Sequence, residues 1–415
     1  MAYSLTGVSY SLRMRQARTL LDSVKAGVES QDLDLVGRAI MTRGAILGSR
    51  RSRADLADLI VARVSGSADH DDVSQGFFEL ASRLERSPIH STGLFVIENL
   101  ARAVGCFAAS LSFGKQARHR IVNAPIQSDL QRTQVFLAHL HNQDLDRAIA
   151  TWHRKTPRPH TAEFWHDAGH MLWLVTDGAA GQADLVTSSS WAETLQGRQV
   201  LALGPAPTSL EGVDSSASLI ARVVAPGVTS WPESDAVGGR IDLSYANSDS
   251  AKWFVVQDNR EVFDSVSFAS FRTDVWKSMN LANGRTARHH KRLLPMPFDK
   301  TNMVPLIAWD VLHVPDVQLS IAGTTFFASQ AAYTPHDVRL KQQRGRTTDQ
   351  RGSTGLSFER CLSFSSHNLS AHHTLMALLA AAGRLQFDPE GQAVIDLSTH
   401  DYLSAIDRLY GQAAV

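Results

Sequence analysis

Serine, histidine and asparagine gather in one short stretch of this chain, Ser363-Phe-Ser-Ser-His367-Asn368, just before the apolar segment Leu375–Ala382. A histidine at the head of a helix has a lowered pKa, because the positive end of the helix dipole disfavours the imidazolium. Such an imidazole can act as a general base near pH 7. The stretch is equally typical of a helix cap, with Ser370 or Asn368 as the capping residue. Both interpretations stay open from the motif alone.

A second histidine pair, His166 and His170, has the i, i+4 spacing that places two imidazoles on one helical face. Zinc metalloproteases combine this spacing with a glutamate beside the first histidine and a third ligand. Here Asp167 stands in the glutamate position and Gly169 weakens the helix. We therefore expect no metal at this pair, and a structural helix whose tryptophans, Trp165 and Trp173, pack inward.

The densest basic run consists of Arg285, Arg288, His289, His290, Lys291 and Arg292. One interpretation is a solvated loop, and the other is an anion site, because guanidinium groups bind phosphate with charge-assisted hydrogen bonds. No aromatic residues alternate with these charges as they would in a single-strand nucleic-acid platform. We therefore expect no nucleic-acid partner.

The elements that must position these groups are best marked by Gln199–Thr208, an apolar strand followed by a Gly/Pro-rich turn at Gly204. A similar strand, Val317–Ala322, runs into Gly323-Thr-Thr325. Strand and helix signals alternate from one turn to the other, which predicts a mainly parallel sheet with helices on both faces. Ligands of such sheets bind at the carboxyl ends of the strands, so the two turns should face one crevice. The strands and the helix expected here are 200–203, 219–224, 240–245, 265–271 and 317–322, with the helix at 304–314.

The first part of the chain, from about residue 10 to 175, has apolar residues spaced by three and four and should be helical throughout. A short repeated sequence, Gln31-Asp-Leu-Asp34 and Gln143-Asp-Leu-Asp146, favours stacked helical hairpins, either as an irregular solenoid or as a plain bundle. The predicted fold class is therefore α plus α/β. It comprises a helical repeat-like domain over 1–180 and a Rossmann-like parallel-sheet domain over 195–415. The polar segment Lys341–Ser353 is either a lid or a flexible insertion.

Composition excludes several classes of protein. The 415 residues contain 43% hydrophobic and 20% charged residues, and 41 basic side chains balance 41 acidic ones. No global field favours nucleic acid or an anionic membrane. The two cysteines, Cys106 and Cys361, predict neither a disulfide framework nor a cysteine-based zinc site. With no signal peptide and no membrane-spanning run, we expect a cytoplasmic protein, peripheral to the inner face of the membrane where an acceptor is lipid-linked.

Taken in order, the motifs of residues 195–412 resemble the sialyltransferases and their bacterial relatives, a superfamily of nucleotide-sugar glycosyltransferases. The segment Val200–Gly227, with its Ala-Leu-Gly-Pro-Ala-Pro turn and Leu219-Ile-Ala-Arg-Val-Val, is similar to the long motif that holds the donor nucleotide. Val237–Asp242, leading to Tyr245-Ala-Asn247, resembles the tail of that motif. Lys300–Met303 and Ser320–Phe326 resemble the short motif, and His367 falls where those enzymes carry a catalytic histidine.

The resemblance implies a Rossmann-like sheet, inverting transfer and no metal or other cofactor, with His367 as the base that takes the proton of the acceptor hydroxyl. It implies a donor site at Gly204, Pro205, Ala206, Arg222, Asn247, Asn302, Gly323, Thr324 and Thr325. Candidates for the phosphate or the acceptor are Tyr333, His336, Arg288 and His289. The chain departs from the family at Pro205, Ala206 and Val224, where asparagine is usual, and at Asn302-Met303, where Ser/Thr-Gly is usual.

The expected function is transfer of a sugar from a nucleotide donor, CMP-linked in the first place, to a glycan or lipid-linked acceptor. The helical half would bind the acceptor or a protein partner. An alternative is a non-catalytic helical scaffold with a degenerate nucleotide-binding domain, which the missing asparagines favour. A third alternative is another Rossmann enzyme such as a methyltransferase. It is disfavoured because the first turn has no further glycines and no acidic residue follows the second strand.

Overall fold

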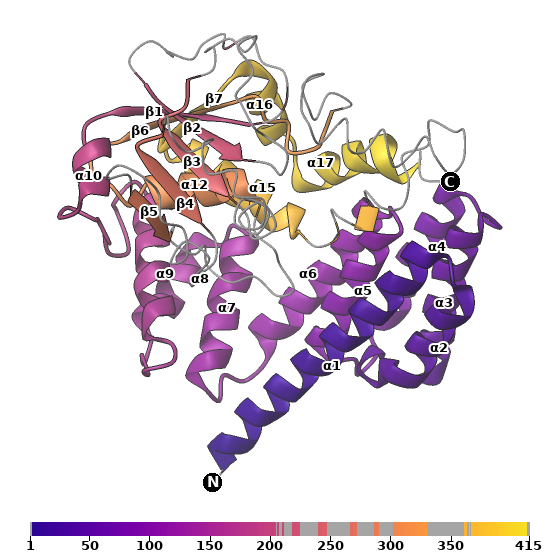
Figure 1. Cartoon of the computed structure of the whole chain (residues 1–415). Helices are drawn as coiled ribbons and strands as arrows, with labels where there is room; N and C mark the ends of the chain where they lie inside the picture. The colour runs from indigo at the N-terminus through magenta and orange to yellow at the C-terminus, as the bar shows by residue number, and fades with distance from the viewer. Residues whose placement is uncertain are drawn as a thin grey trace.

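The computed structural model describes residues 2–204, 206, 210, 218–224, 240–246, 266–271, 286–289, 302–329, 361–362, 365 and 367–412. Within these ranges a helical first part is followed by a parallel sheet with its own helices (Figure 1). The predicted combination of α and α/β structure is therefore confirmed.

Helices follow one another through the first part of the chain, and most begin at a residue whose side chain caps the helix. Their bounds are α1 (Ala2–Ser30), α2 (Leu33–Arg43), η1 (Gly44–Leu47), α3 (Arg50–Ser65), α4 (His70–Glu85), α5 (Ser91–Ala103), α6 (Phe107–Asn123), α7 (Asp129–His141), α8 (Leu145–His153), α9 (Ala162–Val175) and α10 (Ser190–Leu195). At several of their starts a serine or aspartate side chain accepts from the amide of the third helical residue, as Asp69 does for α4 and Ser128 for α7.

The repeated Gln-Asp-Leu-Asp sequence is one kind of helix–turn–helix connection used twice. Gln31 and Gln143 both have a left-handed backbone, and the next residue in each case caps the following helix. The amide of that capping residue donates to a carbonyl five residues earlier, at 2.9 Å in both turns. Gly105 and Cys106 make the same turn between α5 and α6, with the same 2.9 Å hydrogen bond, although their sequence differs.

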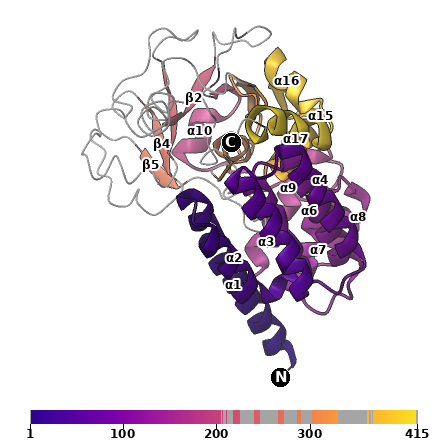
Figure 2. The same cartoon turned by 90° about the vertical axis from the view of Figure 1, so that its right-hand side faces the viewer.

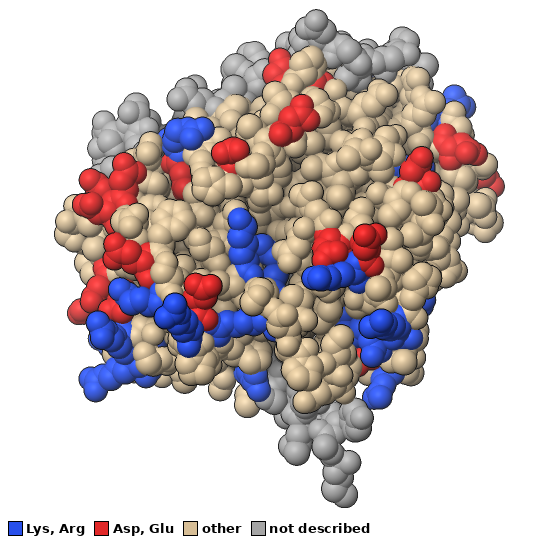
Figure 3. All heavy atoms as spheres, turned by 180° about the vertical axis from the view of Figure 1, so that it is seen from behind, with Lys and Arg blue, Asp and Glu red and all other residues tan. Residues whose placement is uncertain are grey.

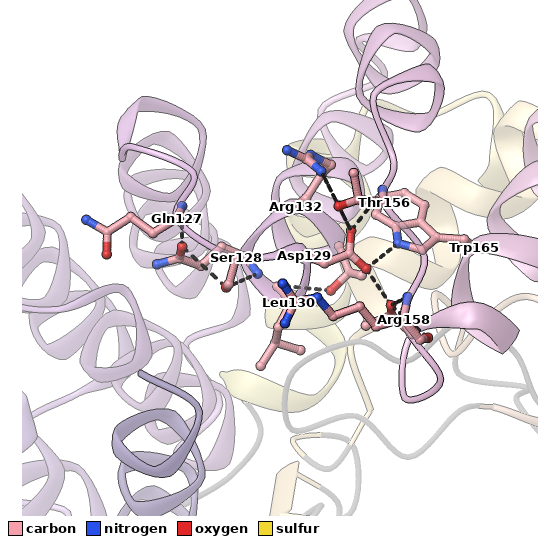
Figure 4. Close-up of polar contacts among 11 residues, drawn as sticks. Gln127, Ser128, Asp129, Leu130, Arg132, Thr156, Arg158 and Trp165 are labelled. Atoms are coloured by element: carbon pink, nitrogen blue, oxygen red, sulfur yellow. Dashed lines mark hydrogen bonds and ion pairs between the residues drawn. The ribbon is translucent and has the colours of Figure 1, made fainter. Parts of the chain in front are cut away.

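One aspartate ties three helices of this part together (Figure 4). Asp129, buried in the first turn of α7, accepts hydrogen bonds from the Trp165 indole of α9 at 2.9 Å and from the Thr161 hydroxyl before that helix. Its other oxygen accepts from the amide of Thr156, after α8, at 3.3 Å. Trp165 is thus packed inward, as the sequence predicts.

In the part of the chain that the structure describes, seven strands form one sheet in the order β5-β4-β3-β2-β1-β6-β7, and every neighbouring pair is parallel. The strands are β1 (Gln199–Leu203), β2 (Leu219–Val224), β3 (Leu243–Ala246), β4 (Phe268–Phe271), β5 (Thr286–His289), β6 (Gln318–Ala322) and β7 (Leu385–Phe387). Five of them lie in the predicted segments. The two edge strands, β5 and β7, were not predicted, since both are short and β5 falls within the basic run.

The remaining helices are α12 (Met303–Val311), α15 (Leu369–Ala381), α16 (Pro389–Ile395) and α17 (Thr399–Ile406), followed by the turn η4 (Asp407–Gly411). α15 contacts α7 and α9 of the helical part as well as β7, and α17 contacts α6. Figure 2 shows α15, α16 and α17 gathered above the helical part, on the side away from β5.

The two faces of the sheet belong to different clusters of buried side chains. Val200, Ala202 and Tyr245 lie on the face that joins the main core, which continues into α1–α9. Leu201, Leu203 and Ile220 point to the other face and form a small cluster with Ala322. The helical part and one face of the sheet therefore share a single core.

Candidate functional site

The sheet reverses its strand order at β1 and β6. The chain proceeds outward from β1 to β5 and then returns to the opposite side of β1 as β6. In open α/β sheets the crevice at such a reversal, beyond the carboxyl ends of the two strands, is the usual ligand site. Gly204 follows β1 and Gly323 follows β6, so the two predicted turns are neighbours at this point.

The two turns lie against each other. The amide of Gly204 donates to the carbonyl of Ala322 and that of Ala206 to the carbonyl of Gly323, both at 2.8 Å. A Cβ at Gly204 would stand 2.2 Å from the Gly323 carbonyl oxygen, so only glycine permits this approach. The amide of Gly323 donates to Asp388, which also caps α16. These three amides are therefore engaged within the protein, and a donor phosphate would have to find other hydrogen-bond donors.

The threonines after Gly323 are the polar side chains of this turn. Thr324 is buried, and the Thr325 hydroxyl lies 2.9 Å from that of Ser329. Arg222 is buried in the carboxyl half of β2, and Asn302 caps α12 without a side-chain hydrogen bond to that helix. Arg222 lies toward the carboxyl edge of the sheet, because it is beside Leu203, the last residue of β1. Asn302 lies toward the same edge, because a crossover helix that leads into a parallel strand, as α12 leads into β6, starts at the carboxyl edge.

His367 also belongs to this edge. It comes directly before Asn368, whose side chain caps α15 by accepting from the amide of Ala371 at 3.2 Å. One turn into α15, His373 stacks on Tyr402, with ring centroids 4.5 Å apart. The Tyr402 hydroxyl donates to the carbonyl of Phe326, three residues after Gly323. The helix that follows the candidate base is thus connected to the segment after the β6 turn.

Basic side chains of the helical part surround the beginning of α15. Arg102 of α5 donates to the carbonyl of His367 at 3.1 Å, and Asn99 donates to the carbonyl of Ser365 at 2.7 Å. The His367 and His372 rings lie 6.4 Å apart. Arg118 of α6 lies 3.3 Å from Nδ1 of His141, at the end of α7. Glu98, 4.0 Å from Arg102, is a buried carboxylate of the same group.

The residues Glu98, Asn99, Arg102, Arg118 and His141 thus form a polar cluster at the start of α15. Three of its polar atoms are buried and have no hydrogen-bond partner within the described part of the chain. They are the Asn99 Oδ1, the Arg102 Nε and the His141 Nε2. Burial, followed by the charges of Arg118 and Arg102, holds the pKa of His141 well below its usual range. A neutral His141, two orphaned donors (the Arg102 Nε and the His141 Nε2) and one orphaned acceptor (the Asn99 Oδ1) suit a polar group bound at the start of α15.

Arg288 has another environment from the one predicted. Its guanidinium makes a bidentate pair with Asp310 of α12, with distances of 2.5 and 3.0 Å, and lies over the ring of Trp191. The Tyr245 hydroxyl donates to the same carboxylate at 2.8 Å. Arg288 is therefore not part of a solvated loop, and its charge is already matched inside the protein.

Several predicted residues lie outside the described ranges: Pro205, Asn247, Tyr333, His336 and the segment Lys341–Ser353. His289 ends β5, and its side chain is not among those described. Sequence reasoning missed Asn99, Arg102, Arg118 and His141. The signal available for them was weak, since charged residues on helices usually face solvent.

Lys and Arg are interspersed with Asp and Glu on the face seen from behind in Figure 3, in keeping with the balanced composition. Among the described residues no helix is long and apolar enough to cross a membrane. No family model, no curated protein and no solved structure matches this chain.

Proposed function

We propose that this protein is a glycosyltransferase that uses a nucleotide-linked sugar, with CMP-linked donors as the first candidates. The observation that supports this best is the position of His367. It lies at the start of α15, toward the same edge of the sheet as the turns at the strand-order reversal, and beside buried basic side chains. Both a base and a source of positive charge are then close to the usual ligand crevice of such a fold.

In the proposed reaction the acceptor hydroxyl loses its proton to His367 as its oxygen attacks the anomeric carbon. The bond from that carbon to the donor phosphate breaks, and the leaving phosphate takes the electron pair. Arg102, which already donates to the His367 carbonyl, would face this developing negative charge. Thr324 and Thr325 would hold the nucleotide in place of the engaged turn amides. The recurrent helical hairpins would form a solenoid-like surface for the acceptor or a protein partner.

The first experiment is a thermal-shift panel of cytidine, uridine, guanosine and adenosine mono- and diphosphates, with S-adenosylhomocysteine included. A ligand that binds only the folded state raises the melting temperature by mass action. We expect a shift with cytidine monophosphate. The variant Arg102→Gln should lose the shift, while Arg86→Gln, an exposed arginine after α4, should keep it. A shift with S-adenosylhomocysteine alone would contradict the proposal.

Transfer itself is tested with His367→Ala. General-base catalysis contributes about 10² to 10⁴ in rate, so turnover should fall at least about a hundredfold while nucleotide affinity is retained. Activity within a few-fold of the wild type would remove His367 from the mechanism.

A non-catalytic nucleotide-binding scaffold is the second candidate. It is favoured by the engagement of the Gly204, Ala206 and Gly323 amides within the protein. Nucleotide binding without release of nucleoside monophosphate from any sugar donor would decide for it.

A further inference from the structure

The segment after α9 returns along that helix as a closely fitted strap, residues 181–186. The amide of Gln182 donates to the Gly169 carbonyl at 2.9 Å, and the amide of Val186 donates to the His313 carbonyl at 2.7 Å. A Cβ at Gly181, whose φ is +85°, would come within 2.3 Å of the Gly169 carbonyl oxygen. The strap is thereby fixed between α9 and the residues that follow α12.

This strap brings a carboxylate to the histidines of α9. Oδ2 of Asp184 lies 3.2 Å from Nδ1 of His166 and 3.9 Å from Nε2 of His313. Ligand atoms of His166, Asp167 and Asp184 all lie within 4.8 Å of one another. Two ligands that are about 2.0–2.1 Å from a tetrahedral zinc ion are separated by about 3.3 Å. The 3.2 Å between His166 and Asp184 is therefore close to the separation of two ligands in one coordination shell, and a ligand atom of Asp167 lies within 4.8 Å of both.

The hydrogen bonds of two buried histidines, His313 and His170, assign them different roles. Nδ1 of His313 lies 2.6 Å from the Trp309 carbonyl oxygen, which can only accept, so Nδ1 carries the proton and Nε2 keeps its lone pair. Metal-ligating histidines are typically oriented in this way by a carbonyl. Nδ1 of His170 instead accepts from the amide of Asp184 at 3.0 Å, so His170 positions the strap.

We propose that His166, Asp167 and Asp184 bind one divalent transition-metal ion, with zinc as the preferred ion and with Nε2 of His313, 3.9 Å from Asp184, beside the site. Mixed imidazole and carboxylate ligands suit zinc better than magnesium or calcium, which prefer oxygen alone. The half-exposed His166 leaves the ion a route from solvent. The bound ion would connect α9 to the strap, which is itself hydrogen-bonded through the Val186 amide to His313, after α12. This site is separate from the proposed donor site and does not depend on glycosyl transfer.

The test uses the full chain, stripped of metal with EDTA and titrated with Zn²⁺ or with Mg²⁺. Calorimetry should show one zinc per chain, with a rise in melting temperature, and no comparable effect of Mg²⁺. His166→Ala and Asp184→Asn should each weaken zinc binding at least about tenfold, since even supporting residues of metal sites have effects of this size.

A matched control is His400→Ala. His400 and Asp401 are also adjacent on a helix and exposed, 3.7 Å apart, but belong to α17. This variant should bind zinc as the wild type does. Circular dichroism of His166→Ala should match the wild type, because its side chain is half exposed. Absence of saturable zinc binding, wild-type affinity in His166→Ala, or an equal loss in His400→Ala would overturn the proposal.

Discussion

At the scale of single residues, the buried polar groups of this protein serve mainly to connect elements that lie far apart in the sequence. Asp129 fastens α7 to the segments around α8 and α9, and Asp310 fastens β5 and β3 to α12. Their sequence neighbourhoods do not distinguish them from surface aspartates. A buried carboxylate is stable only when its hydrogen bonds are satisfied, and those partners are known only from the fold.

Replacing Asp129 with asparagine should lower the free energy of unfolding by about 1–3 kcal/mol, because one of its buried donors loses its acceptor. Burial by itself would raise the pKa of Asp129, but hydrogen bonds from Thr161 and Trp165 outweigh it and bring that pKa below its usual value. The stabilisation is therefore complete above about pH 4 and is lost as the pH falls through the lowered pKa.

Urea unfolding of wild type and Asp129→Asn between pH 3 and pH 7 measures this effect. Asp146→Asn, an exposed aspartate of α8, is the control and should change little. A difference that stays constant across this pH range would show that the Asp129 charge does not contribute.

At the scale of elements, the β1 and β6 turns are a single unit. Each strand is followed by glycine, and the backbone of Gly323 occupies the space that a side chain at Gly204 would need. The sequence shows two similar turns but not their contact. The contact arises because β6 pairs directly with β1, on the side opposite β2.

Gly204→Ala should destabilise the protein by about 1–3 kcal/mol, in the range of overpacked positions, because its Cβ meets the Gly323 backbone. Gly37→Ala in α2 is the matched control, since nothing lies within 4 Å of its Cβ. Alanine favours a helix interior by about 1 kcal/mol over glycine, so this control should be neutral or stabilising. Thermal unfolding of both variants makes the comparison. Equal melting temperatures would mean that the two turns can separate freely.

At the scale of the whole molecule, the carboxyl-terminal residues complete the helical part. The Asp407 carboxylate accepts from the amides of Phe107 and Ala108, at 2.5 and 2.8 Å, and so caps α6 from 300 residues away. Arg63 donates to the Gly411 carbonyl at 2.6 Å. Cys361 lies beside Gly105, the neighbour of Cys106, so the two free cysteines belong to this same junction.

Asp407→Ala should lower the free energy of unfolding by about 2 kcal/mol, the upper range for loss of a helix cap. His70 of α4 lies 3.7 Å from this carboxylate. Burial opposes the charge of His70, but its hydrogen bonds to Asp407 and Asp71 prevail and raise its pKa. The stabilisation that protonated His70 gains from Asp407 is complete below about pH 6.5 and is lost as the pH rises through the raised pKa of His70.

The gap between wild type and Asp407→Ala should therefore widen as the pH falls from 8 to 6. Chemical denaturation at both pH values measures it, with the exposed Asp396→Ala as control. Hydrogen exchange at the first turn of α6 should accelerate in Asp407→Ala only. Unchanged exchange there would contradict the capping role.

Hydrophobic periodicity and glycine turns are local signals, and they were sufficient to predict the classes and order of most elements. It correctly located the helical first part, strands such as Leu219–Val224, and the two glycine turns. It missed β5 and β7, since short edge strands carry little periodicity. It also did not reveal that Arg288, within the basic run, pairs with Asp310.

The contacts between polar residues, in contrast, depend on how distant elements pack. Arg102 and His141 come from helices, far in sequence from His367, and Asp184 reaches the α9 histidines through a strap without regular structure. Residue types and spacing reveal a site when its members lie on one element. When each member comes from a different element, their proximity depends on packing between distant segments, which local sequence patterns do not encode.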